Sequence, residues 1–386
     1  MTDPGATPDP APPAEVVEVR HQTGRYPVLI GAGLLDRLDA LAAEHLPGRR
    51  LAVITDQNVA RAVPHSLKGT VLVVAPGEEA KTRRRWGDLT DQLLELGYGR
   101  DAAIVAVGGG VVGDLAGFVA ATYLRGVPFL QVPTSLVAMV DASVGGKTGV
   151  NTHHGKNLVG AFHQPAAVIA DPLALKTLRR ADLRGGLIEA FKHGLIADAG
   201  YFERMAAESA ALLGRDPAAL AALVRRSVEL KAAIVGQDER EGGVRAVLNA
   251  GHTVGHALEH WSEYRLGHGD AVGLGLVVES FLAEALGLAP AGLAAVVGAR
   301  LAALGLALEF PPAAADGELL DLMRLDKKVR EARLRFALPR EPGTLAGRPG
   351  GWTVEAGDDD VRRALGSARK LAGTVVSTIP GTTTAG

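Results

Sequence analysis

The sequence predicts two domains of different class, an α/β domain built on a parallel sheet followed by an all-α domain. Short apolar runs of strand length alternate with longer helix-compatible stretches up to about Leu178, which is the pattern of buried parallel strands covered by helices. After that point, alanine- and leucine-rich helical patterns dominate, with Glu and Arg spaced between them. A length of 386 residues also favours two domains over one.

The predicted sheet comes from five strand-like runs. Several of these runs end in polar or glycine sequences, namely TDQN, PGEE, GGG and PTS. Because ligands of doubly wound sheets bind beyond the carboxyl ends of the strands, we expect the ligand site of the first domain there. The runs are residues 51–55, 71–75, 103–107, 129–132 and 168–170, with 83–96 as the clearest helix-compatible stretch.

We expect four parts in the chain: a disordered tail at 1–14, an α/β domain at 15–178, a helical domain at 179–375 and a flexible tail at 376–386. The first residues, MTDPGATPDPAPPAE, are acidic and rich in proline, which favours disorder. They contain neither the basic region nor the apolar region of a secretory signal. We therefore expect a cytoplasmic protein.

Composition excludes several function classes. A net charge of −2 gives no reason to expect nucleic acid or membrane partners, and no apolar run reaches membrane-spanning length without a break. The absence of cysteine excludes disulfides and thiolate chemistry. Any transition-metal site must therefore use His, Asp or Glu.

Residues 108–157 carry the densest signal. A glycine triplet follows an apolar strand and precedes a helix-like run, and Lys147 and Lys156 lie in the glycine-containing sequences GGKTG and GKN. Glycines let backbone amides approach a phosphate, and a helix N-terminus adds positive potential. This segment predicts a Rossmann-like nucleotide pocket and a second anion site, although it matches neither the full dinucleotide motif nor a P-loop.

Histidines and carboxylates in the second half have metal-ligand spacing. His252 and His256 are four residues apart, as are Glu189 and His193, so each pair shares one face of a helix. Spacing alone would make both His252 and His256 ligands, but the glutamate of the HExxH zinc motif is absent. A packed, hydrogen-bonded histidine stays the alternative for each. Arg245 precedes Asn249 by the same interval, so we expect these two to share a helical face.

Ten motifs in fixed order give a specific resemblance. They are YPVLIGAGLL, TDQNV, PGEEAKT, GGGVVGD, DASVGGKTGVN, GKNLVGAFHQP, GLIEAFKHG, LNAGHTVGHALE, HGD and DKK. From about Tyr26 to about Leu338, the chain resembles the 3-dehydroquinate synthases of the shikimate pathway, which belong to the sugar phosphate cyclases. The resemblance implies a Rossmann-like NAD-binding domain, a helical metal- and substrate-binding domain, and a homodimer.

The resemblance assigns a cofactor role to residues that chemistry alone leaves open. Asp56 and Asn58 are equally well read as a helix cap, and Glu78 and Lys81 as a surface ion pair. Ser135 replaces the threonine usual in the family and keeps its hydroxyl. The implied NAD-binding residues are Asp56, Asn58, Glu78, Lys81, Gly109, Gly110, Val111, Asp114, Thr134, Ser135, Lys156 and Thr177.

The resemblance also selects among the metal-ligand candidates. It implies that Glu189, His252 and His268 bind Zn²⁺, with Co²⁺ possible, and that His256 contacts the substrate while His193 is structural. HGD replaces the more usual HGE, and we expect Asp270 to lie outside the metal ligands. The implied substrate-binding residues are Arg125, Asp141, Lys147, Asn157, Lys192, Lys231, Glu241, Arg245, Asn249, His256 and one of Lys327 and Lys328.

The activity implied is conversion of 3-deoxy-D-arabino-heptulosonate 7-phosphate, a sugar acid phosphate, to 3-dehydroquinate and phosphate. Its steps are NAD-mediated oxidation, phosphate elimination, reduction, ring opening and intramolecular aldol closure. Three alternatives stay open. They are another sugar phosphate cyclase of secondary metabolism, a metal-dependent polyol dehydrogenase, and a catalytically silent NAD- and metal-binding paralogue.

Overall fold

The computed structural model describes residues 14–311, 314–326, 333–347 and 351–376, and they form two compact units. The first unit consists mainly of Gly24–Thr177, and the second mainly of Leu178–Ala219 and Arg226–Gly386. Two short segments belong to the opposite unit from their neighbours in sequence, Arg20–Thr23 to the second and Leu220–Arg225 to the first. Apart from Ala14 and Val376, both expected tails lie outside the described residues.

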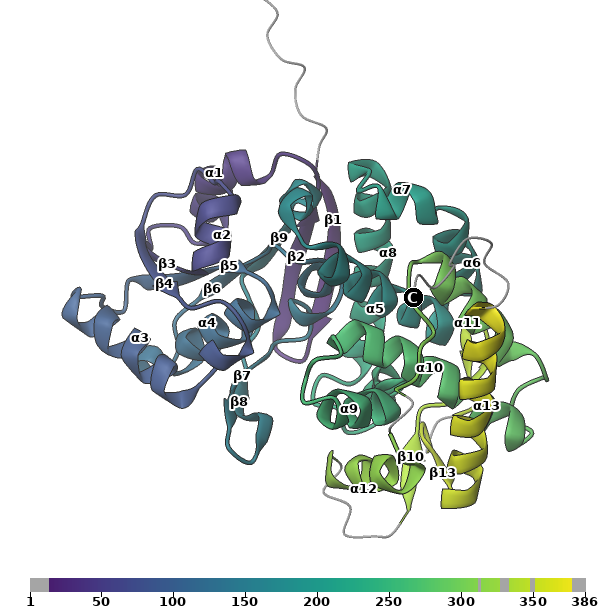
Figure 1. Ribbon diagram of the computed structural model, residues 1–386. Coiled ribbons are helices and arrows are strands. Elements are labelled where there is room, and N and C mark those ends of the chain that lie inside the picture. The colour runs from purple at the N-terminus through teal and green to yellow at the C-terminus, as the bar shows by residue number, and fades with distance from the viewer. Residues whose placement is uncertain (1–13, 312–313, 327–332, 348–350, 377–386) are drawn as a thin grey trace, which may run out of the picture. The chain divides into compact units, whose positions relative to one another are not determined.

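A seven-stranded sheet forms the centre of the first unit (Figure 1), with the strand order β1-β2-β9-β6-β5-β3-β4. All neighbouring strands from β2 to β4 pair in parallel. The five predicted strands are confirmed, and β1 and β2 extend the sheet at one edge. The bounds are β1 Glu15–His21, β2 Gly24–Ile30, β3 Arg50–Asp56, β4 Thr70–Val74, β5 Ala102–Gly108, β6 Phe129–Pro133 and β9 Ala167–Ala170.

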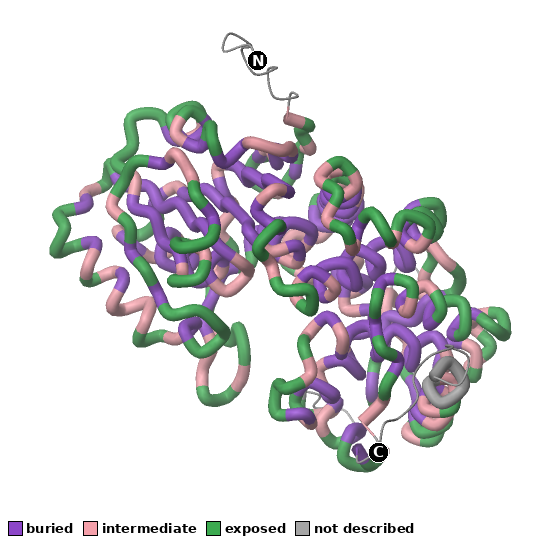
Figure 2. The backbone as a smooth tube through the Cα atoms, turned by 45° about the horizontal axis from the view of Figure 1, so that its top comes forward, coloured by how far each residue is buried: buried purple, intermediate pink, exposed green. Residues whose placement is uncertain are grey.

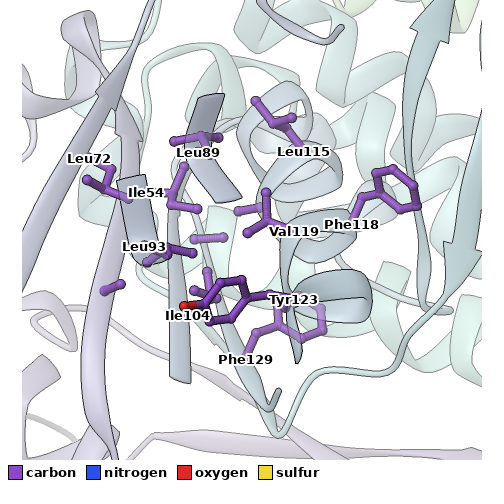
Figure 3. Close-up of a cluster of buried hydrophobic side chains, with 14 of the residues drawn as sticks. Ile54, Leu72, Leu89, Leu93, Ile104, Leu115, Phe118, Val119, Tyr123 and Phe129 are labelled. Atoms are coloured by element: carbon purple, nitrogen blue, oxygen red, sulfur yellow. The ribbon is translucent and has the colours of Figure 1, made fainter. Parts of the chain in front are cut away.

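Helices cover this sheet and bury its apolar strands. The predicted helix at 83–96 is confirmed as α3, Arg83–Glu95, and Thr82 starts it by accepting a hydrogen bond from the backbone N–H of Arg85. Figure 3 shows side chains of α3 and α4 packed with those of β3, β4 and β5, and every residue of β5 is buried (Figure 2). The other helices of this unit are α1 Leu38–His45, α2 Gln57–Ala62 and α4 Gly110–Thr122.

A β-hairpin separate from the main sheet carries the two lysines of the glycine-rich segment. Its strands, β7 Lys147–Thr152 and β8 Gly155–Phe162, pair antiparallel. The turn between them contains His153 and His154. Lys147 and Lys156 therefore lie on strands rather than in a phosphate loop.

The second unit is mainly helical, as predicted, with α10 packed against both α5 and α9. It also holds two small antiparallel sheets, β10 Leu334–Phe336 with β13 Val354–Ala356 and β11 Pro339–Glu341 with β12 Thr344–Leu345. Within the described residues, no helix combines the length and apolarity needed to span a membrane. The helices are α5 Arg180–Ala197, α6 Ala199–Ala207, α7 Ser209–Leu213, α8 Pro217–Gln237, α9 His252–Trp261, α10 His268–Ala285, α11 Leu293–Ala303, α12 Asp316–Asp326 and α13 Asp358–Val376.

Candidate active site

Three helices of the second unit bring a carboxylate and two imidazoles together. Glu189 lies in the middle of α5, His252 is the first residue of α9, and His268 is the first residue of α10. The Oε1 atom of Glu189 lies 3.2 Å from Nε2 of His268 and 3.7 Å from Nε2 of His252. One ligand atom from each residue lies within 4.8 Å of the other two. This donor set fits a divalent metal, and catalytic zinc sites commonly have three protein ligands of this kind.

Backbone geometry places both histidines at helix starts. Gly251 precedes His252 with a φ of +78°, and its N–H donates to Oε2 of the buried Glu279 at 2.7 Å. At the start of α10, the crossing with α5 is very close. A Cβ on Gly269 would lie 2.2 Å from Cα of Gly185. Only glycine allows this approach, and it brings His268 next to Glu189.

The second nitrogen of each ring is also engaged. Nδ1 of His252 lies 3.1 Å from the backbone oxygen of Ala250, and Nδ1 of His268 lies 2.9 Å from Oε2 of Glu259. With the proton on Nδ1, each ring donates to its oxygen and presents the lone pair of Nε2 to the position beside Glu189. Metal-binding histidines are commonly oriented in this way.

Electrostatics separate the two histidines. Burial lowers the pKa of His252 to about 3, and the charge of nearby Lys192 adds to this effect. Burial also acts against the charged form of His268, but hydrogen bonds to Glu189 and Glu259 outweigh it and raise its pKa to about 10. Burial likewise opposes ionisation of Glu189, yet Lys192 and the two histidines hold its pKa well below the usual range. Nζ of Lys192 lies 2.6 Å from Oε2 of Glu189.

His256 occupies a different position from His252, although both lie on α9. It forms a second possible cluster with Glu259 and His268, and its ring centre is 5.9 Å from that of His268. His252 is the member of the HxxxH pair that faces Glu189. Asp270 makes a bidentate pair with Arg184 of α5, at 2.7 and 2.5 Å, and so braces the crossing of α5 and α10.

A loop after α8 carries further predicted substrate residues. The carboxylate of Asp238 accepts hydrogen bonds from the backbone N–H groups of Gly242, Gly243 and Arg245, at 2.8 to 2.9 Å. Arg245 is buried, and its guanidinium donates to the backbone oxygen of Glu239. Asp238 was missing from the predicted set, because a carboxylate that organises backbone has no spacing signature in sequence.

The remaining predicted substrate residues of the second unit are Asn249 with Glu241, then Lys231, and finally Lys327 and Lys328. Asn249 Nδ2 lies 3.4 Å from Oε1 of Glu241, and Lys231 is buried on α8. The expectation that Arg245 and Asn249 share a helical face was wrong. Both lie on the short 3₁₀ helix Val244–Asn249, where residues three apart, not four, align. Lys327 and Lys328 lie outside the described residues.

Predicted cofactor residues of the first unit gather at the carboxyl ends of adjacent strands. The strands β3 and β5 are neighbours, but the chain continues from β3 to β4 on one side and from β5 to β6 on the other. The carboxyl ends of β3 and β5 therefore form a topological switch point. Asp56 ends β3, and its Oδ1 accepts from the N–H groups of Asn58 and Val59, at 2.8 and 3.0 Å. The helix-cap interpretation of Asp56 is therefore correct.

The glycine triplet and the end of β6 adjoin this point. Gly109 caps the N-terminus of α4, and the backbone N–H of Thr134 donates to the oxygen of Gly108 at 2.9 Å. A Cβ on Gly109 would lie 3.3 Å from Oγ of Ser135. The other predicted cofactor residues lie on α4 (Gly110, Val111 and Asp114), in the 3₁₀ helix Glu78–Ala80 (Glu78), on β8 (Lys156) and at the end of the 3₁₀ helix Pro172–Thr177 (Thr177).

Lys81 links the predicted cofactor and substrate residues of the first unit. Its buried ammonium donates to Oδ2 of Asp114 and to Oδ1 of Asn157, both at 2.5 Å. The partner of Glu78 is instead the side-chain amide of Asn151, at 2.7 Å. The remaining predicted substrate residues of this unit are Arg125 in the 3₁₀ helix Tyr123–Arg125, Asp141 in the π-helical segment Ala138–Ala142, and Lys147 at the start of β7.

Comparison with known families covers most of the chain. Residues 71–185 match the 3-dehydroquinate synthase N-terminal family, and residues 186–329 match the 3-dehydroquinate synthase C-terminal family. The chain belongs to the 3-dehydroquinate synthase family. A 3-dehydroquinate synthase of Symbiobacterium thermophilum is 41% identical over 360 residues, covering 90% of this chain and 98% of that protein. One from Xanthomonas oryzae pv. oryzae is 46% identical over 338 residues, covering 82% and 90%.

Solved structures place the fold of this family member among the sugar phosphate cyclases. A 2-deoxy-scyllo-inosose synthase complexed with carbaglucose-6-phosphate, NAD⁺ and Co²⁺ aligns with a TM-score of 0.82 at 22% identity, covering 92% of this chain and 99% of that one. A 2-epi-5-epi-valiolone synthase from Streptomyces hygroscopicus subsp. jinggangensis with NAD⁺ and Zn²⁺ bound has a TM-score of 0.79 at 27% identity, covering 92% and 99%. A probable glycerol dehydrogenase from Sinorhizobium meliloti reaches 0.60 at 18% identity, covering 89% and 96%.

Proposed function

We propose that this chain catalyses the 3-dehydroquinate synthase reaction, which converts 3-deoxy-D-arabino-heptulosonate 7-phosphate into 3-dehydroquinate and phosphate. The observation that carries the proposal is the match of 41–46% identity to relatives of that name over most of the chain. The cluster of Glu189, His252 and His268 supports it, because these residues could hold the metal that this chemistry needs. The protein would be an NAD- and Zn²⁺-dependent carbon–oxygen lyase, with Co²⁺ as an alternative metal.

The two cofactors have separate binding residues in this proposal. When bound, NAD supplies reversible hydride transfer, and the metal polarises substrate hydroxyls and favours their deprotonation. Glu189, His252 and His268 would hold the metal. The N-terminus of α4, opened by Gly109 and Gly110, offers backbone N–H groups to the pyrophosphate.

Asp56 accepts a ribose hydroxyl through Oδ2, because Oδ1 is used by the cap of α2. Lys81 fixes the carboxylate of Asp114 and the side-chain oxygen of Asn157. Through these two contacts it holds one predicted cofactor residue and one predicted substrate residue in a single arrangement.

Basic side chains are assigned to the phosphate and carboxylate of the substrate, which suit charge-assisted hydrogen bonds. Lys192 keeps Glu189 ionised and has further donors for a substrate oxygen. The substrate phosphate itself can accept the C6 proton, so no dedicated protein base is assigned to that step. The anion-binding set is Arg125, Lys147, Lys192, Lys231, Arg245 and one of Lys327 and Lys328, and the polar set is Asp141, Asn157, Glu241, Asn249 and His256.

A second candidate function is that of another sugar phosphate cyclase, favoured by the TM-score of 0.82 to an inosose synthase. A polyol dehydrogenase has less support, with a TM-score of 0.60 to a probable glycerol dehydrogenase. We further propose that the protein acts in the cytoplasm as a homodimer. The substrate is a small molecule, and neither nucleic acid nor membrane is proposed as a partner.

One assay separates these functions. Purified protein with NAD and Zn²⁺ is given the heptulosonate phosphate or a hexose 6-phosphate, and phosphate release and NADH absorbance are followed together. A synthase of the proposed kind releases one phosphate per heptulosonate and accumulates no NADH, because the hydride returns within each cycle. Turnover of the hexose phosphate alone would indicate the other cyclase, and stoichiometric NADH would indicate a dehydrogenase.

A further inference from the structure

Glu259 is a buried carboxylate next to the metal cluster, and neither the helical spacing nor the family resemblance assigns it a role. It lies on α9, seven residues after His252 and three after His256, so these three share one side of the helix. Its side chain is 7% exposed. Its Oε2 lies 2.9 Å from Nδ1 of His268. A carboxylate so well buried is costly unless it is hydrogen-bonded to a partner.

His268 therefore has a carboxylate at each end of its ring. Glu189 Oε1 faces Nε2 at 3.2 Å, and Glu259 Oε2 faces Nδ1 at 2.9 Å. The two nitrogens of an imidazole point in different directions. A metal bound at Nε2 beside Glu189 is therefore on the other side of the ring from the oxygen of Glu259 at Nδ1. The Nδ1 of His252, by contrast, faces only a neutral backbone oxygen, that of Ala250.

The difference matters because the two rings are held unequally. The side chain of His268 is 40% exposed, whereas that of His252 is 13% exposed. Packing therefore restrains His252 more than His268, and His268 depends more on its hydrogen bond for orientation. A carboxylate acceptor also makes the opposite nitrogen a better electron-pair donor to a metal.

We propose that Glu259 is a positioning residue of the metal site. It holds the proton of His268 on Nδ1, fixes the plane of the ring, and directs the lone pair of Nε2 toward the metal, without binding the metal itself. This inference rests on the metal site of the proposed function.

The test measures metal affinity of metal-free protein, independently of turnover. Zn²⁺ is titrated against a chromophoric chelator with wild type, Glu259→Gln and Glu259→Ala. The alanine variant should bind one Zn²⁺ about 10–100-fold more weakly, the range for loss of such a partner. The glutamine variant keeps shape and an acceptor oxygen but not the charge, so its loss should be smaller. Glu263→Ala and Glu263→Gln, at an exposed position just beyond α9, are the matched controls and should bind as wild type does.

A second readout follows the proton directly. Nitrogen-15 NMR of the imidazoles in the Zn²⁺-loaded protein should show a hydrogen-bonded Nδ1–H on His268 in wild type, and this signal should change in both Glu259 variants. Wild type that binds no Zn²⁺ would overturn the proposed function itself. If wild type binds Zn²⁺, unaltered affinity and an unaltered Nδ1–H signal in Glu259→Ala would overturn only the positioning role. Complete loss of binding by folded Glu259→Gln would also overturn it, because Glu259 would then be a ligand.

Discussion

The metal cluster of the second unit and the nucleotide residues of the first unit are organised in different ways. In the second unit, the carboxylate of Glu189 lies within 4 Å of Lys192, His252 and His268, and these residues come from three helices. In the first unit, two predicted cofactor residues are held by contacts within their own helix starts. Asp56 caps its own helix, and Gly109 caps another. Lys81 and Glu78 instead have partners distant in sequence: Lys81 donates to side chains of α4 and β8, and Glu78 accepts from Asn151 of β7.

This difference predicts whether a single substitution affects binding by a whole site or only by the residue replaced. Groups in direct contact couple strongly in free energy, whereas groups with separate partners behave additively. We therefore expect single substitutions near Glu189 to disable the metal site as a whole. Single substitutions among the nucleotide residues should instead cause modest losses that add up. The following predictions test that contrast, beginning with the largest effect.

Replacing His268 by alanine should remove metal binding and turnover together. Loss of a partner outside the metal ligands already costs about 10–100-fold in affinity, so loss of a ligand should cost more than that. Metal content after dialysis and phosphate release measure the two effects. His256→Ala is the matched control from the same histidine cluster, and it should keep the metal while losing activity. Full metal content in His268→Ala would contradict the assignment.

The close crossing of α5 and α10 should be sensitive at one of its two glycines only. A Cβ on Gly269 would lie 2.2 Å from Cα of Gly185, whereas a Cβ on Gly185 would lie 3.7 Å from Cα of Gly269. Gly269→Ala should therefore force the helices apart, with a loss of about 1–3 kcal/mol in the free energy of unfolding and weaker metal binding. Gly185→Ala should be neutral or stabilising by up to roughly 1 kcal/mol, because alanine favours helix. Urea unfolding and metal titration of both variants check this, and equal effects would refute it.

Metal binding should release about one proton near neutral pH. The pKa of His268 is about 10 in the metal-free protein, so its imidazole is charged and must lose a proton to coordinate. His252, with a pKa of about 3, is already neutral, and Glu189 is already ionised. Calorimetry in buffers of different ionisation enthalpy measures the release, and identical heats in all buffers would contradict it.

The raised pKa of His268 makes the stability of the metal-free protein depend on pH. The folded pKa of His268 lies above its unfolded value of about 6.5. Its contribution to the stability of metal-free protein is therefore complete below about pH 6.5 and is lost as the pH rises through about 10. Metal-loaded protein should not lose stability from this source over that range. Thermal unfolding of both forms across this pH interval makes the comparison.

Sequence reasoning succeeded where a local rule fixes the geometry. Apolar runs predicted the five strands β3, β4, β5, β6 and β9, and strand ends placed Asp56 and the glycine triplet at the carboxyl edge of the sheet. It was less decisive for the metal site, because helical spacing alone ranks His252 and His256 equally. Contacts between helices distant in sequence decide which of them faces Glu189. For Glu259, the available sequence signal was its spacing of seven residues from His252 and three from His256. Glu279 and Asp238 accept hydrogen bonds from backbone N–H groups, and such bonds leave no pattern in the sequence.

The smallest expected effect concerns the two roles of Asp56. Asparagine caps helices about as well as aspartate, so Asp56→Asn should change the free energy of unfolding by less than about 0.5 kcal/mol. Oδ1 would still accept from Asn58 and Val59, but an NH₂ group would replace Oδ2, the oxygen proposed to accept a ribose hydroxyl. The affinity for NAD should then fall by roughly 10-fold, the equivalent of one hydrogen bond to a charged group. Fluorescence titration with NADH checks this, with Asp216→Asn, a cap of α8, as the control. If NAD affinity were unchanged, Asp56 would be a helix cap only, and nucleotide binding in the first unit would depend on fewer groups than proposed.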